Sequence, residues 1–337
     1  MSLHLDPASA NRTNNWRSAQ VVALRDLTPT IREFSIRLDA PVACPAGSHV
    51  NVAVQTGVDG DFRSYSVVGS ASDTVRIAVK KLDDSRGGSA FMWTLQAGDA
   101  LQVTTPQCDF PLNEQAPHYL LLAGGVGVTP MVAMAERLAL RGASVRMLYA
   151  ARDASEFAYR TELTALLGDR LSLYDASVGQ IVDLNGEIAA LPVDAELYMC
   201  GPLGLMEAVK TLWGEQGRPA SALRYETFGS SGKFAVASFV VNVPRLGVSI
   251  EVPENRSMLD ALEEAGVAVL SECRRGECGL CAVEIVDLKG DIDHRDVFFS
   301  AHQHGENKRM CACVSRLAGG QVTIDPAFRG DDAFVFA

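Results

Sequence analysis

Three cysteines near the C-terminal end of the chain restrict its fold more than any other feature of the sequence. Cys273, Cys278 and Cys281 have the C-x4-C-x2-C spacing of plant-type 2Fe–2S sites, which need a fourth cysteine further along the chain. Iron bridged by sulfide prefers soft, anionic thiolate ligands. Gly276 and Gly279 let the backbone turn tightly, so that N–H groups can face the sulfurs. The alternatives are three unlinked buried cysteines or a zinc site, which more often shows two C-x2-C pairs.

Cys311 and Cys313 both lie at a suitable distance downstream to supply the fourth ligand. If the two share a strand, their side chains face the same way and stand roughly 6.5–7 Å apart, so only one of them can bond to iron. The interval from Cys281 favours Cys311. Residues 291–308 read as a loop, however, and two extra residues in a loop have a small entropic effect.

Length and composition describe an ordinary soluble globular protein. The 337 residues suggest two or three domains, and 47% hydrophobic with 21% charged residues is typical of that class. The polar N-terminus predicts no signal peptide, and the absence of any run of 18 apolar residues predicts no membrane span. Eight cysteines, four of them expected to bind metal, fit a reducing compartment, so we expect a cytoplasmic protein.

The net charge of −11 argues against nucleic acid as a partner. The charge is uneven, because residues 238–337 contain 10 Lys and Arg against 16 Asp and Glu. A dense negative charge around a redox centre could steer docking onto a basic partner. A solvated surface with no partner explains the same charge nearly as well.

Residues 19–112 consist of short β-branched runs separated by Gly, Pro and Asp. The expected strands are 19–23, 31–38, 49–55, 63–68, 75–79 and 100–104. Six short strands with long connections predict a closed antiparallel barrel.

Two motifs on this predicted barrel are suited to a phosphate and an aromatic ring. Arg63-Ser64-Tyr65-Ser66 offers a guanidinium fork and a flat ring, and Ser85-Arg86-Gly87-Gly88-Ser89 offers backbone N–H groups in a turn. Each motif is weak by itself. A half-exposed strand and an ordinary turn are the simpler explanations.

From residue 119 onward, mostly apolar strands alternate with amphipathic segments, which predicts a parallel sheet with helices on both faces. The expected strands are 119–123, 144–150, 171–176, 196–200 and 223–227, with a helix at 203–213. The first strand runs into Gly124-Gly125-Val126-Gly127-Val128-Thr129-Pro130, where Thr129 is expected to cap a helix and Pro130 to occupy its first position. Such a turn admits a dinucleotide pyrophosphate. The spacing is not G-x-G-x-x-G, and tight strand–helix packing is the alternative.

The fourth strand of this region ends in Cys200-Gly201-Pro202, at the edge where ligands bind in open α/β sheets. A lone cysteine there is more often a small core residue. The polar stretch 229–233 is the clearest domain boundary. Beyond it we expect strands at 239–243 and 248–252, a helix at 258–264, and then the cysteine loop.

These motifs, in the same order along the chain, resemble those of the phthalate dioxygenase reductase family, which includes vanillate demethylase oxidoreductase. The likeness covers residues 20–328. It implies an FMN-binding antiparallel β-barrel, a parallel α/β NAD-binding domain and a C-terminal β-grasp plant-type 2Fe–2S ferredoxin domain. The expected bounds are 1–112, 113–228 and 238–337, with a linker at 229–237.

The resemblance also implies roles for individual residues. Arg63 and Ser89 would hold the flavin phosphate, while Tyr65 would pack on the isoalloxazine. The full set expected to bind FMN is Arg63, Ser64, Tyr65, Ser66, Ala78, Lys80, Gly87, Gly88, Ser89 and Phe228. The set expected to bind the nicotinamide nucleotide is Gly124, Gly125, Gly127, Thr129, Arg152, Cys200, Gly201 and Pro202. The residues expected nearest the reaction are Ser66, Thr129, Cys200, Glu226 and Phe228, although a purely structural role for Glu226 is equally plausible.

The family's Cys-Val-Ser-Arg ending matches Cys313 and the three residues after it, so the resemblance favours Cys313 over Cys311 as the fourth cluster ligand. NADH is expected rather than NADPH, because Arg152 stands alone beside Asp153 and a 2′-phosphate would require more unopposed positive charge.

The implied activity is electron transfer from NADH, through FMN and the cluster, to a Rieske-type non-haem iron oxygenase on another chain. A cytochrome P450 or another one-electron acceptor is the alternative, and a redox sensor without enzymatic activity is a third. The chain is expected to be a monomer. It has no Cys-x-His pair and no evident 2-His-1-carboxylate site, and His302 and His304 are expected to be solvated in a polar loop.

Overall fold

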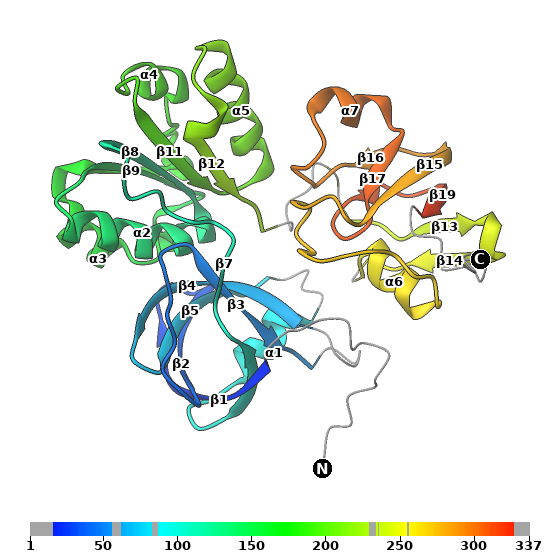
Figure 1. Cartoon of the computed structure of the whole chain (residues 1–337), viewed down its shortest axis with the longest axis horizontal. Helices are drawn as coiled ribbons and strands as arrows, with labels where there is room; N and C mark the ends of the chain where they lie inside the picture. The colour runs from blue at the N-terminus through cyan, green and yellow to red at the C-terminus, as the bar shows by residue number, and fades with distance from the viewer. Residues whose placement is uncertain are drawn as a thin grey trace, which may run out of the picture. The chain divides into compact units, whose positions relative to one another are not determined.

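The computed structural model describes residues 16–55, 62–82, 87–228, 234, 236–254 and 256–326. The chain divides into two compact units, Met1–Glu226 and Thr227–Ala337 (Figure 1). Ser85 and Arg86 of the predicted phosphate loop, and the connector 229–233, lie outside the described residues. Within the described part of the chain, no helix combines the length and the apolar character needed to cross a bilayer.

The first unit begins with a closed antiparallel barrel, as predicted. The strand order is β4-β5-β2-β1-β6-β3, pairing of β3 with β4 completes the ring, and the short β7 pairs with β3. The elements are β1 (Trp16–Asp26), β2 (Ile31–Leu38), β3 (Ser48–Ala53), β4 (Phe62–Ala71), β5 (Thr74–Lys80), α1 (Gly88–Thr94), β6 (Ala100–Thr104) and β7 (Gln107–Cys108). The sequence did not predict α1 or β7.

Alternating apolar side chains fill the barrel, because successive residues of a strand point to opposite faces. In β2, Phe34, Ile36 and Leu38 are buried while Arg37 is exposed. The buried side chains pack into one core with residues from the other barrel strands. This core holds β4 in place, and β4 carries the Arg63–Ser66 motif.

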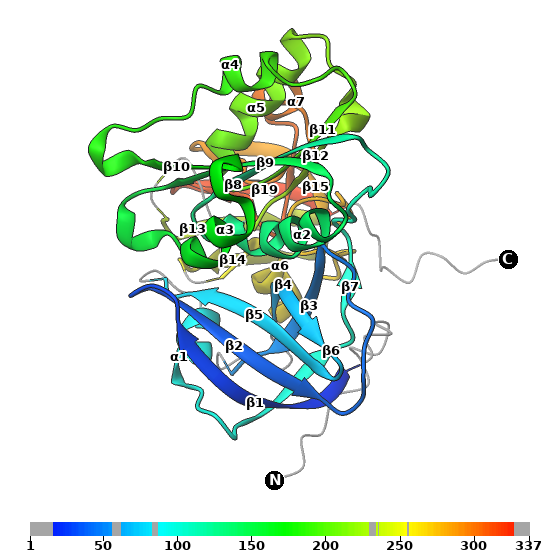
Figure 2. The same ribbon diagram turned by 90° about the vertical axis from the view of Figure 1, so that its left-hand side faces the viewer.

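A sheet of five parallel strands completes the first unit. Its strand order is β10-β9-β8-β11-β12, and each strand agrees with its predicted range to within one residue. The elements are β8 (His118–Gly124), η2 (Gly125–Gly127), α2 (Val128–Leu140), β9 (Ser144–Ala151), η3 (Ala154–Glu156), α3 (Arg160–Leu167), β10 (Leu171–Asp175), α4 (Leu184–Ala189), β11 (Ala195–Cys200), α5 (Leu203–Glu215) and β12 (Leu223–Glu226). Helices α2 and α3 cover one face of the sheet, and α4 and α5 cover the other (Figure 2).

The strand order of this sheet reverses at β8. The chain adds β9 and β10 on one side of β8, and then β11 and β12 on the other. Open parallel sheets bind ligands at the carboxyl ends of the strands beside such a switch point. Because β8 ends at Gly124 and β11 ends at Cys200, both predicted nucleotide motifs begin there.

The second unit is a five-stranded mixed sheet with the order β14-β13-β19-β15-β17, together with the strand pair β16-β18. Its elements are β13 (Phe239–Val243), β14 (Val248–Val252), α6 (Met258–Glu264), β15 (Ala282–Lys289), β16 (Ile292–Asp293), α7 (Ala301–Glu306), β17 (Arg309–Cys311), β18 (Arg316–Leu317) and β19 (Gln321–Pro326). A capping box between Ser257 and Asp260 begins α6, whose Met258, Leu259 and Leu262 enter the core of the unit. This arrangement is the predicted β-grasp fold.

One expectation about the second unit is wrong, and one condition considered for the fourth ligand is not met. The segment 291–308 is not a plain loop, because it contains β16 and α7, and a capping box between Ser300 and Gln303 fixes the start of α7. Cys311 and Cys313 do not share a strand either. β17 ends at Cys311 and a turn follows, so strand geometry does not hold the two side chains on one face.

Candidate functional site

The two nucleotide motifs meet at the carboxyl edge of the parallel sheet. A Cβ on Gly127 would lie 2.2 Å from the carbonyl oxygen of Cys200, and a Cβ on Gly124 would lie 2.6 Å from Cδ of Pro202. Only glycine allows backbones to approach so closely. Cys200 itself is fully buried.

The predicted cap of the following helix is wrong in detail. Helix α2 begins at Val128 with Gly127 as its N-cap, so Thr129 and Pro130 are its second and third residues. The hydroxyl of Thr129 donates to the carbonyl oxygen of Val126 at 3.0 Å. Thr129 is therefore a buried residue within the first turn of α2 and is not its N-cap.

The barrel motif reaches the same edge through β12. Ser66, buried on β4, donates from its hydroxyl to the carboxylate of Glu226 at 3.5 Å. Glu226 is also buried, and the β11–β12 ladder pairs it with Cys200. Four predicted site residues from separate parts of the sequence are thus successive neighbours in space: Ser66, Glu226, Cys200 and Gly127.

Arg63 lies against the start of α1. A Cβ on Gly88 would lie 2.5 Å from Nε of Arg63, and Gly87 before it has a φ of 86°. Ser89 accepts a hydrogen bond at its hydroxyl from the Leu82 N–H at 3.3 Å. The structure therefore brings Arg63 to the described part of the predicted phosphate loop.

The other predicted flavin residues are spread more widely. Tyr65 is half-buried and packs on the barrel core, and the hydroxyl of Ser64 donates to Asn51. Ala78 is buried in β5, whereas Lys80 forms an ion pair with Glu156 of η3. Phe228 is half-buried at the start of the second unit.

Arg152 is exposed immediately after β9. Its neighbour Asp153 caps η3 and accepts hydrogen bonds from the hydroxyl and the N–H of Ser155, and these bonds hold the pKa of Asp153 below its usual value. A negative charge therefore persists beside Arg152.

The cysteine loop has the features of a thiolate site. The N–H groups of Arg275, Glu277 and Cys278 all point to Sγ of Cys273 at 3.4 Å. Burial raises the pKa of Cys273, while these amides lower it. Hydrogen bonds from Cys311 and Cys313 lower the pKa of Cys281 to about 3. The donor set fits the cluster chemistry, because fixed amide dipoles facing sulfur stabilise anionic ligands.

Glycines shape this loop at two points. Gly276 has a φ of 77°, and a Cβ there would lie 2.6 Å from Cγ2 of Val314. Gly279 has a φ of 72°, and a Cβ there would lie 2.3 Å from the ring of Phe298. Both the left-handed backbone and the lack of space require glycine.

Cys311 and Cys313 differ in their surroundings. The hydrogen bond with Cys281 raises the pKa of each thiol most strongly. For Cys313, the charge of Cys273 raises the pKa further and the Gly276 amide lowers it, so this sulfur faces the cysteine loop. For Cys311, the charges of Asp296, Cys281 and Cys313 raise the pKa further.

Sequence reasoning missed one side-chain cluster and was wrong about one of its members. His304 is not solvated in a loop, because it lies on α7 with Nε2 3.0 Å from Oδ2 of Asp296. His294 lies on the other side of the same carboxylate. His302 is exposed, as expected. The Ser300…Gln303 capping-box pattern was the signal that could have placed His304 on a helix.

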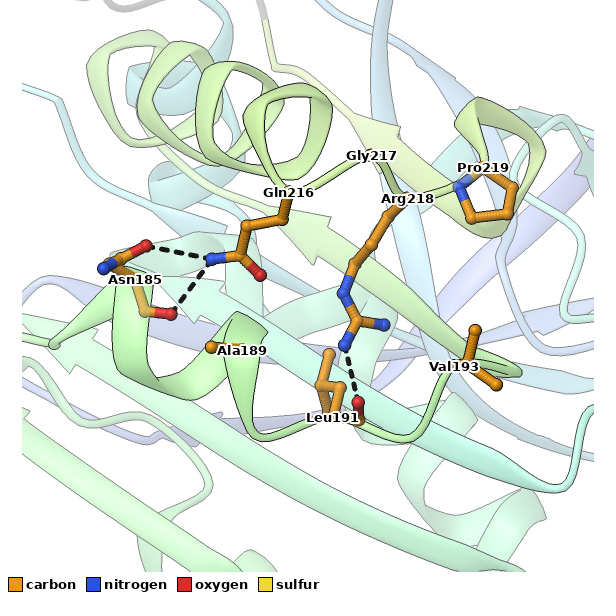
Figure 3. A pocket seen from close by; sticks show the side chains of 8 residues that line it. All are labelled: Asn185, Ala189, Leu191, Val193, Gln216, Gly217, Arg218 and Pro219. Atoms are coloured by element: carbon orange, nitrogen blue, oxygen red, sulfur yellow. Dashed lines mark hydrogen bonds between the residues drawn. The ribbon is translucent and has the colours of Figure 1, made fainter.

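A surface pocket of about 550 Å³ lies between α4 and the loop that follows α5 (Figure 3). The Arg218 guanidinium donates to the carbonyl oxygens of Leu191 and Pro192, and the Gln216 amide donates to Asn185. The loops lining it precede β11 and β12, so the pocket lies at the amino ends of those strands. That is the edge opposite to the predicted nucleotide motifs.

Two families of known sequences match parts of the chain. The family described as "2Fe-2S iron-sulfur cluster binding domain" matches residues 241–318, and "Dimethylamine monooxygenase subunit DmmA-like, N-terminal domain" matches residues 108–223. The heme-dependent oxidative N-demethylase beta subunit of Ectopseudomonas mendocina (strain ymp) is 36% identical over 91% of this chain and 97% of its own length. Phthalate dioxygenase reductase of Burkholderia cepacia is 33% identical over 87% of this chain and 92% of its own length.

A solved structure of phthalate dioxygenase reductase, described as modular for electron transfer from pyridine nucleotides to 2Fe–2S, has a TM-score of 0.75 and 29% identity. The match covers 95% of this chain and 100% of the phthalate dioxygenase reductase chain. The chain belongs to the phthalate dioxygenase reductase family. Like its family, it is an oxidoreductase that serves as the electron-transfer component of an oxygenase system, using a pyridine nucleotide, FMN and a 2Fe–2S cluster. The family and the three-part fold predicted from the sequence are thereby confirmed.

Proposed function

We propose that this chain takes electrons from NADH and delivers them one at a time to a Rieske-type non-haem iron oxygenase on a separate chain. When bound, FMN supplies the conversion between two-electron and one-electron transfer, and the cluster supplies the one-electron exit. The observation that carries the proposal is the Ser66–Glu226 hydrogen bond, which joins the flavin motif of the barrel to the sheet edge that holds the nucleotide motifs.

Arg63 is the proposed partner of the FMN phosphate, because its side chain lies against Gly88 beside the glycine turn. A planar guanidinium binds phosphate through two parallel hydrogen bonds. Gly87, Gly88 and Ser89 complete the phosphate site, and Ser64, Tyr65, Ser66 and Ala78 line the ring. Lys80 has less support as a flavin-binding residue, because its charge is engaged with Glu156.

The nucleotide is proposed to bind where Gly124, Gly125, Gly127 and Thr129 meet Cys200, Gly201 and Pro202. Close backbone packing at this edge keeps the motifs in a fixed relationship. NADH is proposed over NADPH, since Asp153 remains charged beside Arg152 and would repel a 2′-phosphate. Glu226 is proposed to orient Ser66, and Phe228 to lie near the flavin.

Cys273, Cys278, Cys281 and Cys313 are the proposed cluster ligands. The amides around Cys273 and the proximity of Cys313 to Cys273 and Gly276 support this set. Cys311 is paired with Ala282 in the β15–β17 ladder and is completely buried, which supports a role in the core.

We further propose a cytoplasmic monomer with domains at 1–112, 113–228 and 238–337 and a linker at 229–237. None of the eight cysteines, all of which lie among the described residues, forms a disulfide, which supports a reducing compartment. The acidic residues of 238–337 support a basic docking surface on the oxygenase.

A haem protein is the second candidate acceptor. Its support is the relative named for a heme-dependent oxidative N-demethylase, which is 36% identical and aligns over 97% of its own length, together with the match of residues 108–223 to a dimethylamine monooxygenase subunit family.

The deciding experiment mixes the purified chain anaerobically with a Rieske-type oxygenase or with a haem N-demethylase, each taken from the same genome. Reduction is started with NADH and followed by the Rieske EPR signal or by the haem Soret band. We expect at least tenfold faster reduction of the Rieske centre. Faster haem reduction would transfer the assignment to the second candidate, and a tenfold higher kcat/KM for NADPH would contradict the choice of NADH.

A further inference from the structure

Two histidines of the second unit flank one buried carboxylate, and none of the three side chains takes part in the proposed electron transfer. Asp296 has a fully buried side chain, and His294 and His304 have side chains that are 9% and 16% exposed. His294 follows β16, and His304 comes from α7. His294, Asp296 and His304 therefore connect β16 and α7, two elements of the segment that leads to Cys311 and Cys313.

The three potential ligand atoms lie close together. Nε2 of His304 is 3.0 Å from Oδ2 of Asp296, and Nδ1 of His294 is 3.9 Å from Oδ1. All three ligand atoms lie within 4.8 Å of one another. The imidazole rings stack with centroids 4.4 Å apart and planes 20° from parallel.

In the tautomer that carries its proton on Nε2, His294 points an electron pair into this site. Its Nε2 lies 3.0 Å from Oδ1 of Asn307, and an N–H there donates to that amide oxygen. The lone pair of the neutral ring is then on Nδ1, which is buried and lies 3.9 Å from Oδ1 of Asp296, beyond direct hydrogen-bond distance. A buried lone pair facing a carboxylate is unfavourable unless a cation lies between them.

Two further hydrogen bonds hold the carboxylate of Asp296 in place. The Phe299 N–H donates to Oδ2 of Asp296 at 3.0 Å, and the Ser315 hydroxyl donates to Oδ1 at 3.0 Å. Metal sites commonly have such outer hydrogen bonds, which orient each ligand. The hydrogen bond with Asn307 orients His294 in the same way.

We propose that His294, Asp296 and His304 bind a divalent transition metal ion of the Zn²⁺ class. Imidazole and carboxylate are zinc ligands, and bonds of about 2.0–2.2 Å in a tetrahedron place ligand atoms roughly 3.3–3.6 Å apart. The observed 3.0 Å to Oδ2 and 3.9 Å to Oδ1 of Asp296 lie on either side of that range. Water would fill the fourth position.

The metal would connect α7 to the cysteine loop. The Val297 N–H, next to Asp296, donates to the Gly276 carbonyl oxygen at 3.0 Å. An ion holding Asp296 to both histidines would fix this contact, so its role is structural support for the loop. A hydrogen-bonded ion pair without metal is the competing explanation.

The test uses the full chain with flavin and cluster in place, so that iron already occupies the cluster thiolates. The protein is dialysed to equilibrium against Zn²⁺, and zinc and iron are counted in the same sample by mass spectrometry. We expect one zinc per chain, with affinity at least tenfold weaker in His304→Gln. The matched control is His302→Gln, on the same helix but exposed, which should bind as the wild type does.

Two further measurements separate binding from misfolding. Asn307→Gly leaves all three ligands and permits the positive φ of 50° at the end of α7, and it should weaken zinc binding about 10–100-fold, as outer-partner substitutions do. Zinc should raise the temperature at which the cluster absorbance is lost in the wild type but not in His304→Gln. Equal zinc contents in the wild type and His304→Gln, with cluster absorbance intact in both, would overturn the proposal and leave an ion pair only.

Discussion

Gly127 and Cys200 approach so closely that a Cβ on Gly127 would lie 2.2 Å from the Cys200 carbonyl oxygen. Gly127 precedes α2, and Cys200 ends β11. The contact therefore fixes the start of a helix against the end of a strand at the switch point of the sheet.

Gly127→Ala should destabilise the first unit by about 1–3 kcal/mol, because one added methyl group must displace packed backbone. NADH-dependent ferricyanide reduction should fall as well. Gly204→Ala is the matched control, since Gly204 is exposed on α5 and its Cβ would meet no atom within 4 Å. This control should be neutral or stabilising by up to about 1 kcal/mol. Thermal unfolding and steady-state kinetics of both variants measure the difference, and equal behaviour would contradict the proposed close packing.

Cys313→Ser should abolish or severely perturb the cluster absorbance and EPR signal, because the variant lacks one of four thiolates. Cys311→Ser should leave both signals largely intact, since that thiol belongs to the core. The two variants serve as controls for each other. The reverse result would move the fourth ligand to Cys311.

Arg63→Ala should weaken FMN retention while the cluster spectrum stays unchanged. Loss of a charged phosphate partner costs on the order of 2–4 kcal/mol, or roughly 30- to 1000-fold in affinity. Arg37→Ala is the control, because Arg37 is exposed on β2 and donates to Gln20. Flavin fluorescence after dilution measures release, and full occupancy in Arg63→Ala would exclude Arg63 as the phosphate partner.

Glu114 should stabilise the first unit in a pH-dependent way. Hydrogen bonds from Arg137 and Arg141 lower the pKa of Glu114 from 4.5 to about 2. A carboxyl group whose pKa is lower in the folded state stabilises that state above the unfolded pKa, and the effect is lost as the pH falls through the folded pKa. The stability gap between the wild type and Glu114→Gln should thus be full above pH 4.5 and narrow toward pH 2.

Urea unfolding monitored by tryptophan fluorescence measures this difference in stability, because all three tryptophans lie in the first unit: Trp16, Trp93 and Trp213. Glu215→Gln, which removes an exposed carboxylate at the end of α5, should retain the wild-type pH profile. A gap that stays constant from pH 6 to pH 2 would show that the arginine pairs do not stabilise the fold.

Electron transfer to the oxygenase should slow as salt increases, because added ions screen the attraction between an acidic domain and a basic surface. Ferricyanide reduction by the same protein should depend on salt far less. Stopped-flow rates from 50 to 500 mM salt compare the two reactions. Equal dependence would leave the acidity of residues 238–337 as a solvated surface.

The sequence predicted elements best where one pattern dominated. The strands Ile31–Leu38 and Phe239–Val243 match their expected ranges because apolar residues there alternate with polar ones or are β-branched. The helix Met258–Glu264 also matches, since Ser257 and Asp260 form its cap. In each case the signal is local to the element.

The missed features depend on contacts between distant residues. Helix α1 begins with Gly88, a poor helix former, and the helix allows Arg63 to lie over that glycine. The early start of α2 follows from the packing of Gly127 on Cys200, which no local pattern reveals. The meeting of His294 with His304 likewise required the position of α7.

The position of β19 makes the second unit dependent on the last part of the chain. This strand, Gln321–Pro326, lies between β13 and β15, so it joins the two halves of the sheet. During synthesis the barrel and the parallel sheet can fold as soon as Glu226 has emerged, whereas the ferredoxin sheet cannot close until residue 326 has been added. A ribosome that stops early would therefore release a folded first unit whose electrons have no route to the oxygenase.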